Sequence, residues 1–285
     1  MTKLVIMIPA LNEEKNIADV IKRIPKKMAS KTEIVVINDG STDRTKEVAK
    51  AAGATVIGFK KNRGLAIAFK KGVEYAISVN ADIIVNIDAD GQHPPEKIPE
   101  LISPIIKDKA DLVIGSRLIQ VDGKMKKSKF YSNILLSKFM SFLIGQNIYD
   151  STSGFRAFTS EVAKAMNIID KYTYTQQQLI QAAYHKFKIL EIPIPIINRE
   201  DGESRLMKNI FSYAFSVIGI LLYSFTYCYP LASFGLVGFL SILLGLGLDM
   251  LFPTRYIMSA VFILAGTQLV LFGLLFNLLK KYTIR

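Results

Sequence analysis

Residues 82–90, DIIVNIDAD, are the stretch that decides the fold. An almost unbroken apolar run ends there at two carboxylates, Asp88 and Asp90. A short run of this kind, closed by polar residues, is typical of a strand buried on both faces of a parallel sheet. Ligands of such sheets bind beyond the carboxyl ends of the strands. The stretch therefore predicts a buried strand at 82–88 with a binding site directly after it.

Strands and helices alternate on both sides of this stretch. We predict further strands at 3–9, 33–38, 55–58, 112–116 and 190–196. We predict helices at 13–24, 41–52 and 64–79, with Asn12 as the cap of the first. This alternation implies an α/β fold with a doubly wound, mainly parallel sheet. Polar clusters at 12–14 and 39–43 follow two of the strands, so we expect them at the same sheet edge as the two carboxylates.

Composition divides the chain into two regions. Of the 285 residues, 50% are hydrophobic and 21% are charged, which excludes a disordered chain. The mean hydropathy of +0.29 indicates membrane segments. One span needs about 20 apolar residues, and residues 209–248 and 256–279 contain no charged residue. We predict a soluble domain over 1–205 and, within 230–285, a transmembrane hairpin of helices at about 230–252 and 256–279 with a basic tail.

Two more segments have an amphipathic character. Residues 206–229 are rich in Phe, Tyr and Ser, which predicts an interfacial helix or linker. Residues 128–146 combine flanking lysines with large apolar side chains, which fits either a core-packed helix or a helix on the membrane surface. A pair of buried core helices is the alternative to the hairpin, but both apolar runs lack the polar stripe of such helices.

The formal net charge of +12 indicates an anionic partner, such as phosphate compounds, acidic lipids or nucleic acid. We expect no nucleic-acid binding, because no recognised motif accompanies the charge. Basic residues flank the hairpin on both outer sides, which places the domain on the cytoplasmic face. The start of the chain has no signal-peptide pattern. The single Cys228 excludes an intrachain disulfide, and two histidines make a structural zinc site improbable.

The pair Asp88 and Asp90 can reach one hard cation from the end of its strand. Mg²⁺ or Mn²⁺ takes one or two protein carboxylates and completes its shell with substrate phosphates. Gln92 is a further candidate ligand. The alternative is a loop start in which an aspartate caps a helix.

Asp39 ends another strand, in the segment Asp39-Gly40-Ser41-Thr42-Asp43. An acidic residue in this position can accept hydrogen bonds from a base or a ribose. The alternative is a turn in which Ser41 or Thr42 caps the next helix. The chain has neither a P-loop nor a G-x-G-x-x-G motif, which counts against an ATPase or a dehydrogenase.

Taken together, the motifs resemble the family 2 glycosyltransferases, which have the GT-A fold. The resemblance covers about residues 3–205 and rests on Pro9-Ala10-Leu11-Asn12-Glu13-Glu14, Asp39-Gly40-Ser41-Thr42-Asp43, Asn62-Arg63-Gly64, Asp88-Ala89-Asp90-Gly91-Gln92-His93, Gly115-Ser116-Arg117 and Ser153-Gly154-Phe155-Arg156. Within the family, the Gln92-His93 extension and the C-terminal hairpin look most like the dolichyl-phosphate mannose or glucose synthases.

The resemblance implies a role for each matching position. The residues implied for the nucleotide-sugar are Pro9, Ala10, Asn12, Glu13, Asp39, Gly40, Arg63, Gly64, Asp88, Ala89, Asp90 and Gln92. Asp88, Asp90 and Gln92 would hold Mg²⁺ or Mn²⁺. Phosphate groups of the lipid or the donor would contact Arg117, Arg156, Arg199, Ser204 and Arg205, of which Arg117 and Arg156, with Asp90, are the implied catalytic residues.

One departure from the family bears on the acceptor. Many relatives carry an acidic residue, often taken as a general base, where this chain has Gln176, Gln177 and Gln178. A sugar or alcohol acceptor needs a base, whereas a phosphate monoester is already mostly dianionic at pH 7. The glutamines therefore favour a polyprenyl (dolichyl) phosphate acceptor, with Asp150 as an alternative carboxylate whose role stays open.

The expected enzyme is membrane-bound and inverting, and its lipid-phosphate sugar would serve glycan assembly. The sequence does not choose between GDP-mannose, a UDP-hexose and a UDP-N-acetylhexosamine, and a homo-oligomer is compatible with it. A family 2 enzyme acting on another lipid-linked glycan and a non-enzymatic membrane scaffold are the alternatives. Intact Asp88 and Asp90 argue against the scaffold.

Overall fold

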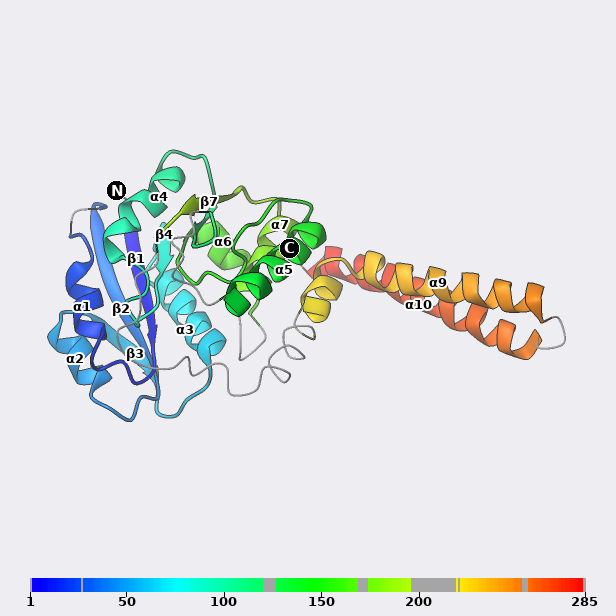
Figure 1. The fold of residues 1–285 in the computed structure, drawn as a ribbon, viewed down its shortest axis with the longest axis horizontal. Helices are drawn as coiled ribbons and strands as arrows, with labels where there is room; N and C mark the ends of the chain where they lie inside the picture. Colours follow the sequence, from blue (N-terminus) through cyan, green and yellow to red (C-terminus); the bar gives the residue numbers. More distant parts are fainter. Residues whose placement is uncertain are drawn as a thin grey trace. The chain divides into compact units, whose positions relative to one another are not determined.

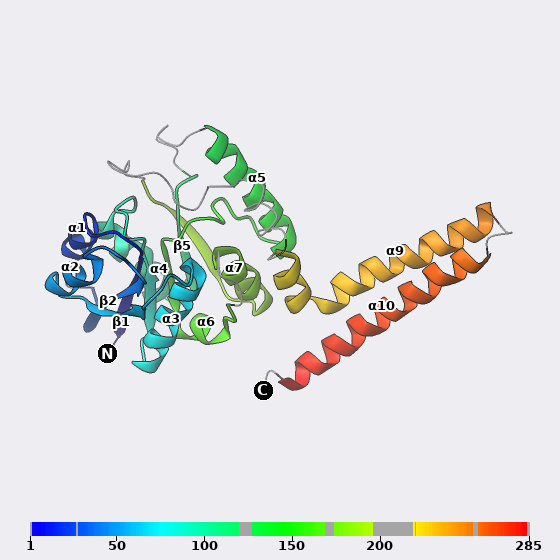
Figure 2. The same cartoon turned by 90° about the horizontal axis from the view of Figure 1, so that it is seen from below.

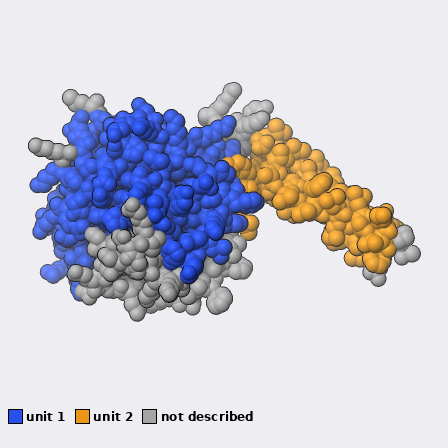
Figure 3. Space-filling view, turned by 45° about the horizontal axis from the view of Figure 1, so that its top comes forward, with its two compact units in different colours: residues 1–217 blue, residues 218–285 orange. Residues whose placement is uncertain are grey.

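The computed structural model describes residues 2–26, 28–119, 127–168, 174–195, 219, 221–252 and 256–283. The chain divides into two compact units, residues 1–217 and 218–285, which are coloured separately in Figure 3. The domain boundary expected at 205 and most of the segment expected as an interfacial helix, 206–218, lie outside the described residues. Within that segment, residues 221–228 are helical.

The first unit is built on one seven-stranded sheet in the described part of the chain. Its strands are β1 (Lys3–Ala10), β2 (Lys31–Asp39), β3 (Thr55–Phe59), β4 (Ile83–Asn86), β5 (Leu112–Ser116), β6 (Arg156–Thr159) and β7 (Ile189–Pro193). They lie in the order β3-β2-β1-β4-β6-β5-β7. Every pairing is parallel except those of β6, which runs antiparallel to both of its neighbours. The expected doubly wound, mainly parallel sheet is thus confirmed.

Helices cover both faces of this sheet (Figures 1 and 2). They are α1 (Ile17–Arg23), α2 (Thr45–Ala51), α3 (Leu65–Ser78), a 3₁₀ turn η1 (Pro95–Lys97), α4 (Ile98–Ile106), α5 (Lys127–Ile144), α6 (Ser160–Ala165) and α7 (Thr175–Tyr184). Helices α1 and α4 pack on one face, where their apolar side chains join a single buried cluster with alternate residues of β1 and β4. Helix α3 packs on the opposite face against β1 and β2.

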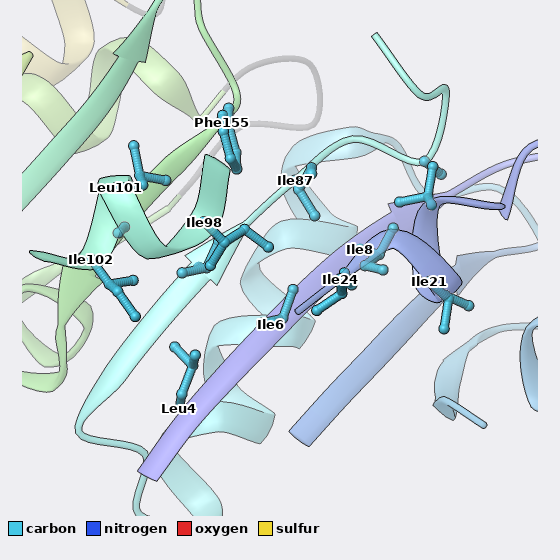
Figure 4. Packing of buried hydrophobic residues seen from close by; sticks show 14 of the residues in the cluster. Leu4, Ile6, Ile8, Ile21, Ile24, Ile87, Ile98, Leu101, Ile102 and Phe155 are labelled. Carbon is cyan, nitrogen blue, oxygen red and sulfur yellow. The ribbon is translucent and has the colours of Figure 1, made fainter. Parts of the chain in front are cut away.

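Strand β1 shows why the pattern of apolar residues predicts this arrangement. Its side chains alternate between the faces, so that Leu4, Ile6 and Ile8 enter the same cluster as the side chains of α1 and α4 (Figure 4). Met7 points the other way, toward α3. A Cβ atom placed on Gly72 of that helix would come within 2.9 Å of the Met7 sulfur. The glycine therefore lets the helix lie close against the sheet.

Several elements differ from the sequence-based expectations. Strand β6 and helices α4, α6 and α7 were not expected, and β4 ends at Asn86 instead of at 88. The helix expected at 13–24 begins only at Ile17. Its N-cap position is Asn16, so Asn12 is not the cap that we expected.

The second unit contains two long helices, α9 (Pro230–Leu251) and α10 (Tyr256–Thr283), which lie side by side (Figures 1 and 2). By length and composition, both are apolar enough to cross a membrane. This pair of apolar helices matches the expected hairpin. Glycines set the spacing of the two helices, since a Cβ atom on Gly238 would lie 2.5 Å from the carbonyl oxygen of Gly266.

Candidate active site

The candidate site lies at the carboxyl edge of the sheet, next to β1, where the order in which successive strands are added reverses. Strands β2 and β3 lie on one side of β1 and β4 lies on the other. In open α/β sheets, ligands bind at the carboxyl ends of the strands where the winding reverses in this way. The loops that follow β1, β2 and β4 therefore meet at one place. These loops begin at Leu11, Gly40 and Ile87, and they carry most of the residues expected to bind the nucleotide-sugar.

The loops after β1 and β2 are tied together by hydrogen bonds. Asn12, which has a positive φ of 54°, donates its backbone N–H to Ser41 Oγ at 2.9 Å. Its side-chain oxygen accepts the backbone N–H of Thr42 at 2.7 Å. Neither Ser41 nor Thr42 caps α2, because the N-cap position of that helix is Arg44. Asn12 and Ser41 therefore shape the site instead of starting helices.

Asp39 anchors the loop that precedes α3. Its carboxylate is buried and accepts the backbone N–H groups of Arg63 at 2.8 Å and Gly64 at 2.9 Å. Gly40 has a φ of +73°, and a Cβ atom there would lie 2.3 Å from the carbonyl carbon of Lys61. The two loops touch so closely that only glycine fits. Asp39, Gly40, Arg63 and Gly64 thus come together as expected, with Arg63 exposed to solvent.

Asp88 and Asp90 follow β4 and keep part of their surface exposed. Asp90 accepts the backbone N–H of Gln92 at 3.1 Å, which fixes the turn after the strand. Asp88 lies 4.0 Å from Nε2 of the buried His93. A Cβ atom on Gly154 would come within 3.0 Å of the Asp88 carboxylate. The chain just before β6 therefore packs closely against Asp88.

The two carboxylates fit a divalent cation that is shared with a substrate. Among the described residues, no group of three or more His, Cys, Asp or Glu side chains could hold a metal by itself. Two aspartates one residue apart supply hard oxygen ligands and leave the other positions to phosphate oxygens, which is how Mg²⁺ is usually bound. Gln92 lies next to the pair and is half-buried. The donor set is thus that of a metal–phosphate site and not of a closed protein cage.

Arg117 is held by Asp150 in a bidentate ion pair. Arg117 Nε donates to one oxygen of Asp150 at 2.7 Å, and Nη2 donates to the other at 2.9 Å. The backbone N–H of Arg117 donates to the same carboxylate, and Thr152 Oγ1 accepts from Nη2 at 2.6 Å. The side chain of Arg117 is only 11% exposed, and its guanidinium is therefore fixed in one orientation.

Electrostatics link this pair to the two aspartates. Burial alone would lower the pKa of Arg117, but the hydrogen bonds and charge of Asp150, followed by the charges of Asp88 and Asp90, raise it above its ordinary value. Burial would raise the pKa of Asp150, but the hydrogen bonds and charge of Arg117 outweigh it and lower that pKa to about 2. Asp150 is therefore a fixed anion that positions Arg117. A carboxylate with this pKa is a poor general base near pH 7.

Arg156 is placed differently from what we expected. It is fully buried, and its guanidinium donates to the backbone oxygens of Ser153, Thr175 and Ser151 and to Oε1 of Gln178. Burial lowers its pKa to about 10. A guanidinium enclosed in this way cross-links three segments of the chain. The arrangement argues against the phosphate contact and the catalytic role that the resemblance implied for Arg156.

Gln176, Gln177 and Gln178, which stand where many relatives carry an acidic residue, are also buried. Gln178 accepts a hydrogen bond from Arg156, so part of this polar stretch serves to enclose the guanidinium. Tyr174, which precedes the segment, stacks on Phe69 with ring centroids 3.7 Å apart. Its hydroxyl accepts a hydrogen bond from Asn86 at 2.8 Å. No sequence pattern predicts this Tyr174–Asn86 contact, because the two residues lie 88 positions apart.

The other implied residues divide into two groups. Pro9, Ala10, Glu13 and Ala89 lie where their loops leave the strands, and Glu13 donates its backbone N–H to Thr45 Oγ1 at 2.8 Å. Arg199, Ser204 and Arg205 lie outside the described residues, so their roles stay predictions.

Known proteins with similar sequences include glycosyltransferases. Residues 5–166 match the family model of glycosyl transferase family 2. The chain is 32% identical to the UDP-N-acetylglucosamine–dolichyl-phosphate N-acetylglucosaminyltransferase of Methanococcus voltae, over 70% of this chain and 88% of that protein. It is 35% identical to the dolichol-phosphate mannosyltransferase of Pyrococcus furiosus, over 74% of this chain and 61% of that protein.

A solved structure shares the fold. Glucosyl-3-phosphoglycerate synthase from Mycobacterium tuberculosis, in complex with Mn²⁺ and UDP, superposes with a TM-score of 0.63 at 21% identity, over 78% of this chain and 80% of that chain. At this identity the likeness concerns the fold, which is therefore GT-A-like. The chain belongs to glycosyl transferase family 2 and is a glycosyltransferase.

Proposed function

We propose that this enzyme transfers a sugar from a nucleotide-sugar to a polyprenyl (dolichyl) phosphate and thereby makes a lipid-phosphate sugar for glycan assembly. The names of relatives that are more than 30% identical support this acceptor class. The observation that carries the proposal is the Arg117–Asp150 pair. In it, the positively charged guanidinium of Arg117 is held near enough to Asp88 and Asp90 to interact with their charges. Such an arrangement suits two phosphate groups that must approach each other.

The donor would bind at the carboxyl ends of β1, β2 and β4. Asn12 and Asp39 would shape the pocket for the nucleoside, since they hold the loops that line this edge. Asp88 and Asp90, with Gln92 beside them, would hold Mg²⁺ or Mn²⁺ on the diphosphate. When bound, the ion would neutralise charge that develops on the leaving group.

The acceptor phosphate would meet Arg117. Its guanidinium is already oriented by Asp150 and Thr152, so binding costs little further ordering of the side chain. A phosphate monoester is mostly dianionic at pH 7 and needs no general base. The low pKa of Asp150 and the enclosed glutamines of α7 agree with an acceptor of this kind.

The reaction would be one in-line displacement. An oxygen of the acceptor phosphate forms a bond to the anomeric carbon while the bond from that carbon to the diphosphate oxygen breaks, and the electron pair leaves with the nucleoside diphosphate. The configuration inverts because attack and departure occur on opposite sides. The chain contributes by fixing both phosphates in position.

The membrane would hold the lipid tail of the acceptor. Helices α9 and α10 are long enough to span it, and the basic flanks favour a cytoplasmic catalytic domain. Helix α5 adds exposed apolar side chains such as Leu135 and Phe142, of which 72% and 83% are exposed. Its lysine-flanked apolar surface suits the membrane interface.

The proposal is tested with the full-length protein in liposomes. Labelled GDP-mannose, UDP-glucose and UDP-N-acetylglucosamine are each offered with polyprenyl phosphate, with the unphosphorylated polyprenol and with a lipid-linked glycan. We expect metal-dependent transfer to the phosphate alone from one donor of the panel. Asp90→Ala should lower this turnover at least about 100-fold, whereas Asp19→Ala, on the exposed surface of α1, should not.

Each outcome of that assay decides a specific point. Unchanged turnover in Asp90→Ala would refute the metal assignment. Transfer to the lipid-linked glycan but not to the phosphate would refute the proposed acceptor while leaving the family intact. A protein that binds donor in the presence of Mn²⁺ yet transfers to none of the acceptors would favour the scaffold.

A further inference from the structure

Helix α10 carries an amide in the middle of its apolar stretch. Gln268 lies twelve residues after Tyr256 and eleven before Leu279, the two ends of the possible span. At about 1.5 Å per residue, the amide is about 16–18 Å from either end. The side chain is far too short to reach the headgroups from there.

Three hydroxyl groups in the described part of the hairpin donate hydrogen bonds within it. Ser241 donates to the carbonyl oxygen of Phe262 at 2.8 Å, and Ser259 donates to that of Gly245 at 2.6 Å. Thr267, next to Gln268, donates to Ile263 of its own helix at 2.8 Å. Gln268 is exposed and makes no side-chain hydrogen bond within the described part of the chain. It is a polar group at the middle of the span that needs a partner outside the hairpin, whereas the other amide of α10, Asn277, lies two residues from the end of the span.

Gln268 belongs to the face of α10 that points away from α9. The face toward α9 carries small residues, since a Cβ atom on Gly266 would lie 2.5 Å from the carbonyl oxygen of Gly238. The other face repeats at alternating steps of four and three residues and comprises Ile257, Val261, Leu264, Gln268, Leu271, Leu275 and Leu278. The six apolar members are 50–67% exposed. This spacing is that of a coiled-coil seam.

We propose that this seam of α10 binds a second copy of the chain, and that the Gln268 amides of the two copies hydrogen-bond to each other. The inference rests on the proposed membrane location of the hairpin and not on the proposed chemistry. Copies inserted in the same direction carry Gln268 at the same depth, so a two-fold axis along the membrane normal brings the amides together. An amide both donates and accepts, which makes it complementary to itself.

The amide, and not the leucines, selects this partner. Lipid tails solvate leucine as well as another helix does, so apolar side chains alone provide little drive for association in a membrane. An amide in hydrocarbon finds no acceptor among lipid tails, whereas the same amide on a neighbouring helix satisfies it. A single polar residue in a coiled-coil seam also fixes the register of the two helices.

The test is cysteine cross-linking of the full chain in isolated membranes. In a Cys228→Ser background, Leu264→Cys places a thiol on the seam one turn from Gln268. Val270→Cys is the matched control, because Val270 faces Gly238 of α9. We expect oxidation to give a covalent dimer of the first variant but not of the second.

A second pair of variants isolates the amide. Adding Gln268→Leu to Leu264→Cys keeps the side-chain volume and should lower the cross-linked fraction about 3- to 30-fold. Adding Thr267→Val should leave it unchanged, since that hydroxyl is satisfied within its own helix.

The possible results are distinct. Equal cross-linking at positions 264 and 270, no dimer in membranes, cross-linking to a different protein, or an unchanged dimer fraction in Gln268→Leu would each overturn the inference. Extraction of the chain from membranes by alkaline carbonate would instead overturn the membrane location on which it rests. The transfer assay is read separately, so loss of the dimer and loss of the proposed activity cannot be confused.

Discussion

Replacing Asp150 by asparagine tests the role of the Arg117–Asp150 pair most directly. The substitution keeps the shape of the side chain but removes the charge that faces the guanidinium. It also turns an acceptor oxygen into an NH₂ group, which opposes the donors of Arg117 and Thr152. Both effects should destabilise the fold and free Arg117 from its fixed orientation.

The size of the effect follows from the pKa of the carboxyl group. The drop from 3.8 to about 2 corresponds to about 2.5 kcal/mol of preference for the ionised form, at about 1.4 kcal/mol per pKa unit. Leaving a buried charge without its partner typically costs about 3–5 kcal/mol. We therefore expect Asp150→Asn to lower the free energy of unfolding by about 3 kcal/mol. For a domain of this size, that is a fall in Tm of about 6–12 °C.

The pH dependence has a definite sign. The pKa of Asp150 is depressed by folding, so its stabilisation is present above the ordinary carboxyl pKa and is lost as the pH falls toward 2. The difference in Tm between wild type and Asp150→Asn should therefore be constant from about pH 5 to pH 8 and should shrink below about pH 4.

Thermal unfolding of the full chain in detergent, followed by circular dichroism, measures these differences. Asp19→Asn is the control, because its pair with Arg23 is exposed and should contribute at most about 1 kcal/mol. In the transfer assay, Asp150→Asn should raise the KM for the acceptor about tenfold and change the KM for the donor little. Equal stability of Asp150→Asn and Asp19→Asn, or a joint rise of both KM values, would refute the proposed role of Asp150 in holding Arg117.

Three further substitutions test the supporting architecture by the same thermal measurement. Gly40→Ala should lower the free energy of unfolding by at least about 2 kcal/mol, because its Cβ would clash with the backbone of Lys61. Gly53→Ala has open space around it and should lose only about 1 kcal/mol, from the strain of its positive φ. Equal losses in the two variants would contradict the clash. Arg156→Lys should lower the free energy of unfolding by about 3 kcal/mol, since an ammonium group cannot replace the four hydrogen bonds of the guanidinium. A variant that stays stable but has a raised KM for the acceptor would instead support the phosphate contact implied for Arg156. Tyr174→Phe should cost about 1 kcal/mol, because it keeps the ring stack and loses the contact with Asn86; a silent change would show that Asn86 is satisfied in another way.

The parallel half of the sheet was predictable because its strands are buried on both faces. Strand β1 and the run that ends at Asp88 consist almost entirely of apolar residues, and this pattern survives without knowledge of any neighbour. Strand β6 was missed because it has only four residues and begins with Arg156. Such a segment looks like a loop until the strands on either side of it are known.

The part of the site that lies in short motifs after the strands was predictable from the sequence. Asp39 and Asp88 follow strands, so the topology brings them to one edge. The burial of Arg156 and of the glutamines in α7 was not predictable, since arginine and glutamine are usually exposed. The burial of Arg156 depends on partners between 3 and 22 residues away, including backbone oxygens, which carry no sequence signal.

The antiparallel direction of β6 has a consequence for how the enzyme can diversify. The chain leaves β5 at Ser116 and re-enters the sheet at Arg156, and the pairing of Ile114 with Arg156 puts both points at the same edge. The chain between β5 and β6 thus leaves the sheet and returns to it at the edge where the candidate site lies. It carries Arg117, Asp150 and α5, and also Gly154, which lies against Asp88, whereas the loops after β1, β2 and β3 come from other parts of the chain. Exchange of residues 117–152 between relatives should therefore change which acceptor is used and leave the binding of the nucleoside, for which we propose those other loops, as it was.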